Sequence, residues 1–328
     1  MGRSMNYLSP WRIPYMLKNR FLAAVALLFC VSCSVGAEEG ASGAQFLRIG
    51  PAAMVSSLGE AGAVVTGAQS VFYNPAGLSG VGGTEVSVSH VKWIMELGYS
   101  SLAAAKRIGG GVYALSVNYL AIPAISKYDR YGSKLSDSYS ASDKAVTAAY
   151  ARSISDRTSV GFGLKYISCT LDSDSASAFA ADAGVRHEAL PGTLVFGASV
   201  QNAGTTLKYQ SQGDPLPLNL KAGGRYIFKM EEERDLKKSV AVLADVNQLR
   251  DTGVYANLGL DFSAIYANNS AFSLRAGYKA DAADSGGGLS FGLGMDMETY
   301  SIDYAYSPMG DLGQAHRMSF NLKFGAAG

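Results

Sequence analysis

The sequence predicts an all-β fold, a transmembrane antiparallel β-barrel of about 14 strands. From about residue 84 to the C-terminus, apolar and polar residues alternate with a period of two, the pattern of strands with one apolar face. The alternating segments are about 9–12 residues long, which suits a tilted strand that crosses a bilayer. Beyond the N-terminus no apolar run reaches the ~18 residues of a membrane helix. The chain can therefore span a membrane only as a closed barrel, in which every backbone group finds a partner.

Residues 1–37 are predicted to form a secretory signal peptide. A basic region that ends at Arg20 precedes a long apolar run, and small residues before Ala37 supply a cleavage site. Met16 would give this signal a more ordinary start than the first residue. Lipidation at Cys33 is the alternative, because the preceding residues form a poor but usable lipobox.

The alternating region divides into segments that we expect to be the strands. They centre near 84–91, 97–107, 111–120, 143–153, 158–169, 176–187, 192–202, 218–229, 238–248, 253–263, 271–280, 287–297, 299–306 and 315–324. An even number is what single-chain outer-membrane barrels require.

The two faces of these segments differ in chemistry. In the segment 111–120, Tyr113, Leu115 and Val117 share one face, whereas Ser116 lies on the other. Aromatic residues near the predicted strand ends resemble the girdles of membrane barrels, at Tyr119, Tyr226, Phe228, Tyr278, Tyr300 and Tyr306. The opposite face, assigned to the lumen, carries Lys165, Asp182, Arg186, Lys221, Arg225, Asp245, Asp261, Arg275, Lys279, Asp296, Asp303, Arg317 and Lys323.

The predicted connections fit a barrel whose N-terminus lies in the periplasm. The long connections 121–142 and 203–217 then face outside, and 155–157 is a tight periplasmic turn. The long, charged segment 229–238 falls on the periplasmic side and breaks this pattern. A soluble β-sandwich with one wet face is the competing fold, since it predicts the same alternation; it does not account for the many tyrosines or the signal peptide.

Composition and motifs argue against several classes of function. A formal net charge of +1 does not favour nucleic acid as a partner. His90, His187 and His316 have no metal-binding spacing, and Cys169 would be the lone cysteine after signal cleavage. No nucleophile elbow or phosphate-binding loop is present in the sequence. We therefore expect no enzyme activity, no cofactor and no metal.

Two further segments resemble known sites only in part. The segment 171–178 opens like a calcium loop but lacks its glycine and its closing glutamate, so we interpret it as an exposed loop. The glycines of 284–294 lack the strand-then-helix context of a dinucleotide site, and we interpret them as relieving crowding in a barrel strand.

The stretch 71–80, VFYNPAGLSG, and the small residues before it resemble the N-terminal pattern of FadL-like outer-membrane proteins. The similarity is strongest to the shorter branch of PorV/PorQ-like and spirochaetal FadL-related proteins. The resemblance implies a fourteen-stranded barrel over 81–328, with residues 38–80 as a hatch inside its lumen. The chain departs from the family in being shorter than the enterobacterial channel and in running past Phe324 to GAAG.

The hatch residues implied by the resemblance are Phe72, Asn74, Pro75, Ala76 and Gly77. Pro75 fixes its own φ and holds Asn74 in an extended conformation. The amide side chain of Asn74 can then bond the barrel wall or its own backbone. The alternative is an ordinary Asn-Pro turn that leads into the first strand.

The resemblance implies a channel in the outer membrane for uptake of hydrophobic small molecules, with long-chain fatty acids as the family's substrates. Arg225, Arg275 and Lys279 are then candidate lumen partners for a carboxylate. The expected partners are a hydrophobic small molecule, outer-membrane lipid and the barrel-assembly machinery, with no nucleic acid. The alternative function is that of PorV-like relatives, which bind or shuttle exported protein cargo.

Overall fold

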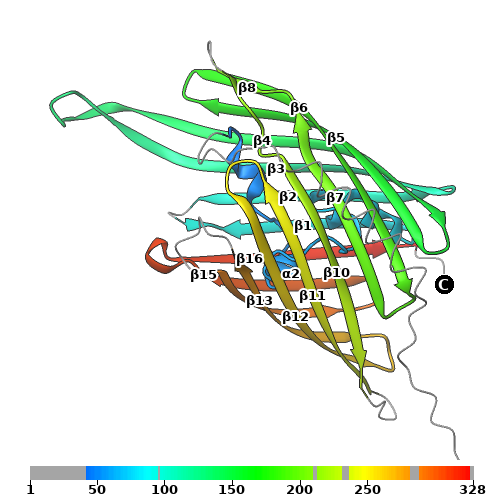
Figure 1. Ribbon diagram of the computed structural model, residues 1–328. Helices are drawn as coiled ribbons and strands as arrows, with labels where there is room; N and C mark the ends of the chain where they lie inside the picture. Colours follow the sequence, from blue (N-terminus) through cyan, green and yellow to red (C-terminus); the bar gives the residue numbers. More distant parts are fainter. Residues whose placement is uncertain (1–41, 95–96, 210–212, 231–235, 281–287, 326–328) are drawn as a thin grey trace, which may run out of the picture. The chain divides into compact units, whose positions relative to one another are not determined.

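The computed structural model describes residues 42–94, 97–209, 213–230, 236–280 and 288–325. Its main feature is a closed barrel of 14 antiparallel strands, shown in Figure 1, in which β1 (Thr84–Lys92) pairs with β16 (Gln314–Phe324). Successive barrel strands are hydrogen-bonded neighbours all the way round. The predicted antiparallel barrel of about 14 strands is therefore confirmed.

The remaining barrel strands are β2 (Gly98–Ile108), β3 (Gly111–Tyr128), β4 (Lys134–Ser155), β5 (Thr158–Leu171), β6 (Asp174–Leu190), β7 (Leu194–Gly204), β10 (Asn219–Lys229), β11 (Leu236–Leu249), β12 (Gly253–Tyr266), β13 (Ala271–Ala280), β14 (Gly288–Asp296) and β15 (Tyr300–Pro308). Between β7 and β10, β8 (Leu207–Lys208) and β9 (Gly213–Asp214) form a separate two-stranded sheet. Part of the charged connection 229–238 and the signal segment 1–37 lie outside the described residues.

The segment 121–142, predicted to be a loop, is instead the extension of β3 and β4 into a long hairpin. β3 pairs with β4 as far as Tyr128 and Lys134, whereas β3 pairs with β2 only as far as Ala121. The Asp129 side chain closes the turn by accepting backbone hydrogen bonds from Tyr131 and Ser133 at 2.8 and 2.9 Å. Both faces of the extension are exposed, so its sequence lacks the apolar alternation that identified the other strands.

The outer surface of the barrel is apolar. Leu115 lies in the part of β3 that pairs with β2 and is 56% exposed, and its neighbours Tyr113 and Val117 on the same face are also exposed. Ser116, on the other face, is buried toward the lumen. An apolar surface that encircles a barrel is stable in lipid, where closed barrels leave no backbone group unpaired.

The residues from 42 to 81, here called the lumen segment, lie inside the barrel. They contain η1 (Gln45–Arg48), α2 (Ala53–Ser56), η2 (Ala68–Phe72) and η3 (Pro75–Gly80). Ala53 N donates to Ser319 Oγ of β16, and Ala63 N donates to Asp245 Oδ2 of β11, each at 2.8 Å. Among the described residues no helix is long or apolar enough to cross a membrane.

We expect Leu115→Arg to weaken folding into a bilayer. An arginine on the lipid face near the bilayer midplane costs about 2–4 kcal/mol, which equilibrium unfolding in phospholipid vesicles would measure. The control is Leu135→Arg, at an exposed leucine of the hairpin extension. That variant should change the free energy of unfolding by less than about 0.5 kcal/mol. Equal losses in the two variants would contradict the assignment of the apolar surface to lipid.

Candidate functional site

The lumen segment is anchored at Asn74, which is completely buried. Asn74 has the extended backbone that a following proline requires, with φ −153° and ψ 106°. Its Oδ1 accepts a hydrogen bond from Ala76 N at 3.1 Å, and its Nδ2 donates to Ala63 O at 2.7 Å and to Val185 O of β6 at 3.1 Å. One side chain thus caps η3, ties two parts of the lumen segment together and joins them to the wall.

The other predicted hatch residues surround this anchor. Pro75, Ala76 and Gly77 form the first turn of η3 and are buried. A Cβ on Gly77 would overlap Val65 O, so only glycine fits there. Phe72 is tied to the wall through its carbonyl oxygen, which accepts a hydrogen bond from Gln201 Nε2 at 2.9 Å. The structure therefore brings all five residues together, and their role in gating stays a prediction.

Glycines of the barrel wall allow the lumen segment to approach the strands closely. A Cβ on Gly277 of β13 would overlap Gly59 N, and a Cβ on Gly161 of β5 would overlap the backbone of Pro75. Gly292 of β14 faces the side chain of Ser57 in the same way. This contact agrees with our interpretation of the glycines of 284–294, of which the structure describes those from Gly288 onward.

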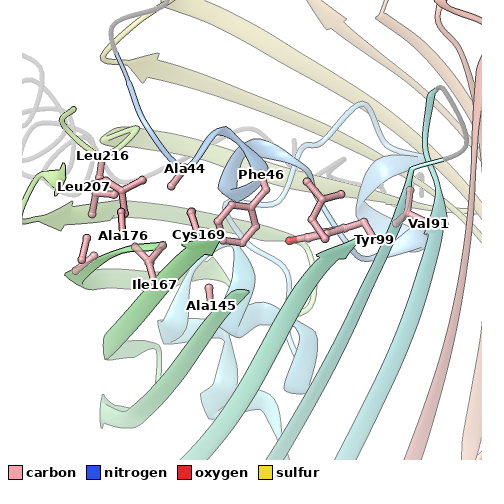
Figure 2. Close-up of a cluster of buried hydrophobic side chains, with 13 residues drawn as sticks. Ala44, Phe46, Val91, Tyr99, Ala145, Ile167, Cys169, Ala176, Leu207 and Leu216 are labelled. Atoms are coloured by element: carbon pink, nitrogen blue, oxygen red, sulfur yellow. The ribbon is translucent and has the colours of Figure 1, made fainter. Parts of the chain in front are cut away.

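Two cavities lie beside η1 and the residues that follow it. The larger, here called the vestibule, has a volume of about 430 Å³. Its apolar lining comes from the lumen segment, from the β1–β2 and β15–β16 connections, from β3 and from the end of β15. It includes Phe46, Ile49, Trp93, Leu97, Leu120, Pro308 and Leu312. Phe46 also packs into a buried cluster that contains Tyr99 and Ile167, as Figure 2 shows.

The smaller cavity, here called the polar chamber, has a volume of about 70 Å³. Its polar lining includes Asn118, Thr147, Lys165, Gln201, Asn202, Asn219, Lys221 and Asn257. Both cavities are lined by Arg48, Ile49, Gly50, Glu60 and Lys279. A stretch of the lumen segment around Ile49 is therefore a wall common to both.

Arg317 of β16 fixes this common wall. Its Nε donates to Gly50 O at 3.2 Å, and its Nη2 lies 3.9 Å from Glu60 Oε1. The guanidinium also lies over the ring of Trp93, 4.9 Å from the centroid. The alternation of β16 placed Arg317 in the lumen, but nothing in the sequence indicated its contacts with residues more than 200 positions away.

Two of the three predicted carboxylate partners lie outside both cavities. Arg275 is neutralised by its neighbours, with Nε 3.0 Å from Asp261 Oδ2 and Nη1 2.6 Å from Asp303 Oδ1. Arg225 lines neither cavity. Lys279 lines both, and its Nζ lies 5.3 Å from the centroid of the Tyr255 ring.

Tyr73 supplies a neutral wall beside the polar chamber. Burial, together with the negative charge of Glu60, raises the pKa of Tyr73 well above its ordinary value. Its hydroxyl oxygen accepts a hydrogen bond from Ala52 N at 3.0 Å. Tyr73 therefore remains a protonated phenol at physiological pH and brings no negative charge to the site.

The segments that resembled known sites have other roles. The segment 171–178 turns tightly at Asp172 and Ser173 between β5 and β6, so it is a hairpin rather than a longer loop. Asp172 accepts a hydrogen bond from Lys127 at 3.0 Å. Among the described residues no group of three or more His, Cys, Asp or Glu side chains can hold a metal ion.

Solved structures with a similar fold include three hydrocarbon channels. The toluene transporter TbuX of Ralstonia pickettii has a TM-score of 0.57 and 14% identity, over 84% of this chain and 98% of that chain. The toluene transporter TodX of Pseudomonas putida has a TM-score of 0.53 and 12% identity, over 88% and 97%. The monoaromatic hydrocarbon channel CymD has a TM-score of 0.52 and 13% identity, over 84% and 98%.

The chain shares the fold of these channels. No protein-family model matches it, and no curated protein has a significantly similar sequence. The barrel fold implied by the FadL-like resemblance is thereby confirmed, whereas placement in the PorV/PorQ-like branch stays a prediction. At such low identity the chemistry of the site has to come from the chain's own residues.

We expect Asn74→Ala to loosen the lumen segment while the barrel stays closed. The substitution removes the donor to Ala63 O and Val185 O, and a buried unpaired polar group costs about 1–3 kcal/mol. Amide hydrogen exchange in 61–80 should then become about tenfold faster or more. The control is Asn321→Ala, which removes a bond between two wall strands, to Ser301 Oγ at 2.9 Å. Unchanged exchange in Asn74→Ala would show that the anchor lies elsewhere.

Gly277→Ala should separate Gly59 from the wall. Overpacking of this kind costs about 1–3 kcal/mol, so we expect faster amide exchange around residues 57–61. The matched control is Gly163→Ala, because a Cβ there meets nothing closer than Thr147 Cγ2 at 3.4 Å. If the two variants exchange alike, close packing on Gly277 does not hold the segment in place.

Proposed function

We propose that the protein is an outer-membrane channel for uptake of hydrophobic small molecules. The observation that carries this proposal is the apolar vestibule, which is bounded by the lumen segment inside a barrel with an apolar exterior. Ligand sites of this kind are concave and mostly apolar, with few polar groups. The fold of this chain is similar to that of channels for toluene and other monoaromatic hydrocarbons, and this similarity supports transport rather than enzyme activity. An outer-membrane barrel of this type would be surrounded by outer-membrane lipid and inserted by the barrel-assembly machinery.

Long-chain fatty acids are the substrates that we propose for this channel. The vestibule combines apolar side chains such as Phe46 and Leu120 with charged ones. Its cationic side chains are those of Arg48, Lys279 and Arg317, which outnumber the two acidic ones, Asp143 and Glu60. An alkyl chain gains from burial against the apolar side chains, and a carboxylate is attracted by the cationic ones.

The lumen segment acts in this proposal as a hatch. It is held by individual polar contacts such as Ser199 Oγ to Tyr73 O at 3.0 Å and by close packing on wall glycines. Passage requires these contacts to rearrange, and a ligand in the vestibule touches the segment directly at Phe46 and Ile49. Binding can therefore favour a displaced arrangement of the segment, provided that the ligand binds that arrangement more tightly.

The alternative function, binding or shuttling of exported protein cargo, has one structural observation in its favour. The extension of β3 and β4 beyond β2 and β5 gives the barrel an exposed hairpin that bears Tyr128, Tyr131 and Leu135. A protein partner would bind there and not in the vestibule. Deleting 124–138 would abolish a cargo function and leave small-molecule binding intact.

Mass spectrometry of lipids extracted from gently purified protein tests the proposal. The comparison sample is the same protein without the predicted hatch, residues 38–80. Fatty acids retained by the full protein and lost from the shortened one would support the channel. Absence of bound lipid from both samples, together with normal fatty-acid uptake in cells that lack the protein, would contradict it and favour the cargo role.

Leu312→Asp should weaken binding of a fatty acid by about tenfold, since the loss of one buried apolar side chain and the gain of a negative charge both disfavour the ligand. Leu312 lines the vestibule from the β15–β16 connection and is half exposed, so the barrel tolerates the change. Fluorescence of Trp93, which lies in the same cavity, measures the affinity. The control Leu135→Asp changes an equally accessible leucine outside the vestibule and should bind as the wild type does.

A further inference from the structure

The polar chamber contains a buried ammonium group without an anionic partner in contact. Lys221 of β10 is 7% exposed and lines the chamber. Within the described part of the chain its Nζ makes no hydrogen bond and no ion pair within 4.0 Å. It lies over the ring of Tyr73, 5.4 Å from the centroid. A buried ammonium is unfavourable unless a partner or water compensates its charge.

The carboxylates of Asp245 and Glu60 have other contacts. Asp245 directs Oδ2 at the lumen segment, where it accepts a hydrogen bond from Ala63 N at 2.8 Å. Glu60 accepts a hydrogen bond from the Ser56 hydroxyl and also interacts with Arg317. The contacts of both carboxylates are thus with groups other than Lys221, whose ammonium faces the chamber lining.

The rest of the lining is polar and suits a hydrated ligand. Lys165 and Arg48 also line the chamber, but Lys165 is paired with Asp182 at 3.1 Å and Arg48 Nη1 lies 3.8 Å from Asp251 Oδ2. Glu60 brings a negative charge to the same lining, and this charge is already engaged by Ser56 and Arg317. The Oδ1 atoms of Asn118 and Asn219 have no hydrogen-bond partner among the described residues and need donors, which water can supply. A volume of about 70 Å³ admits a small carboxylate with a little water but not the chain of a long fatty acid.

We propose that the polar chamber binds an oxyanion, with Lys221 as its charged contact. The oxyanion is either a free carboxylate or the head group of an amphiphile whose chain lies in the vestibule. The second source requires this part of the lumen segment to move, because Arg48, Ile49 and Gly50 line both cavities and stand between them. Only this second source rests on the proposed function; the oxyanion site itself does not.

Calorimetric titration of the full chain in a nonionic detergent tests the site with three probes: octanoate, 1-octanol and butanoate. The variant Lys221→Met keeps the apolar stem and removes the charge. The matched control is Lys208→Met, at an exposed lysine of β8. We expect the wild type and Lys208→Met to bind octanoate about tenfold or more tightly than octanol. Lys221→Met should bind octanoate no better than octanol, with octanol binding unchanged.

A second variant keeps the test decisive if Lys221→Met fails to fold. Asn219→Asp leaves Lys221 in place and adds a negative charge to the chamber lining, so it should weaken octanoate binding and spare octanol. Butanoate binding that depends on Lys221 would identify a free carboxylate as sufficient. Octanoate binding that depends on Lys221 without butanoate binding would identify a head group.

The opposite results overturn the inference. One such result is that the wild type binds octanoate and octanol with equal affinity. Another is that Lys221→Met still prefers octanoate to octanol. The third is that neither octanoate nor butanoate binds. The chamber would then hold water only. If octanol and octanoate do not bind but butanoate binds through Lys221, the proposed function fails and the oxyanion site stands.

Discussion

The rest of this structure depends on one constraint: the lumen segment has little regular structure of its own, so the barrel wall must satisfy its backbone. A chain inside a closed barrel is shielded from bulk water, and each unpaired backbone group there is costly. The wall meets this need with side chains aimed inward, such as Ser319 for Ala53 N and Glu85 for Ala68 N. Those contacts give some of the polar residues in the lumen a structural role, because they pair with backbone groups of the segment.

The course of the segment also creates the two cavities. Where its residues around Ile49 cross near the wall, they divide the free space into an apolar part next to Trp93 and a polar part next to Lys221. An amphiphile matches this division, since one end of it avoids water and the other requires polar contacts. The separation of apolar and polar linings, rather than the barrel itself, is what gives the proposed substrate class its physical basis.

The fold leaves the choice of ligand open. Channels for toluene and other monoaromatic hydrocarbons share the barrel with this chain at 12–14% identity, and a shared fold does not fix the chemistry of a site. The charges in the lumen are also of two kinds. Arg275 is paired with Asp261 and Asp303 and joins neighbouring parts of the wall, whereas Lys221 lies over the Tyr73 ring and has no ion pair among the described residues.

The sequence by itself determined the strands and their faces, because side chains on a strand alternate strictly and lipid selects apolar residues on one side. The strand expected at 271–280 is β13, and the residues assigned to lipid, such as Leu115, are exposed. The sequence did not predict the hairpin extension at 121–142, because both faces of the extension meet water and no apolar alternation arises there. Only the tertiary structure decided that Arg317 reaches Gly50 and that Lys221 has no ion pair within the described part of the chain. Such contacts join residues far apart in the sequence, and local periodicity carries no information about which inward-facing residues meet across a lumen.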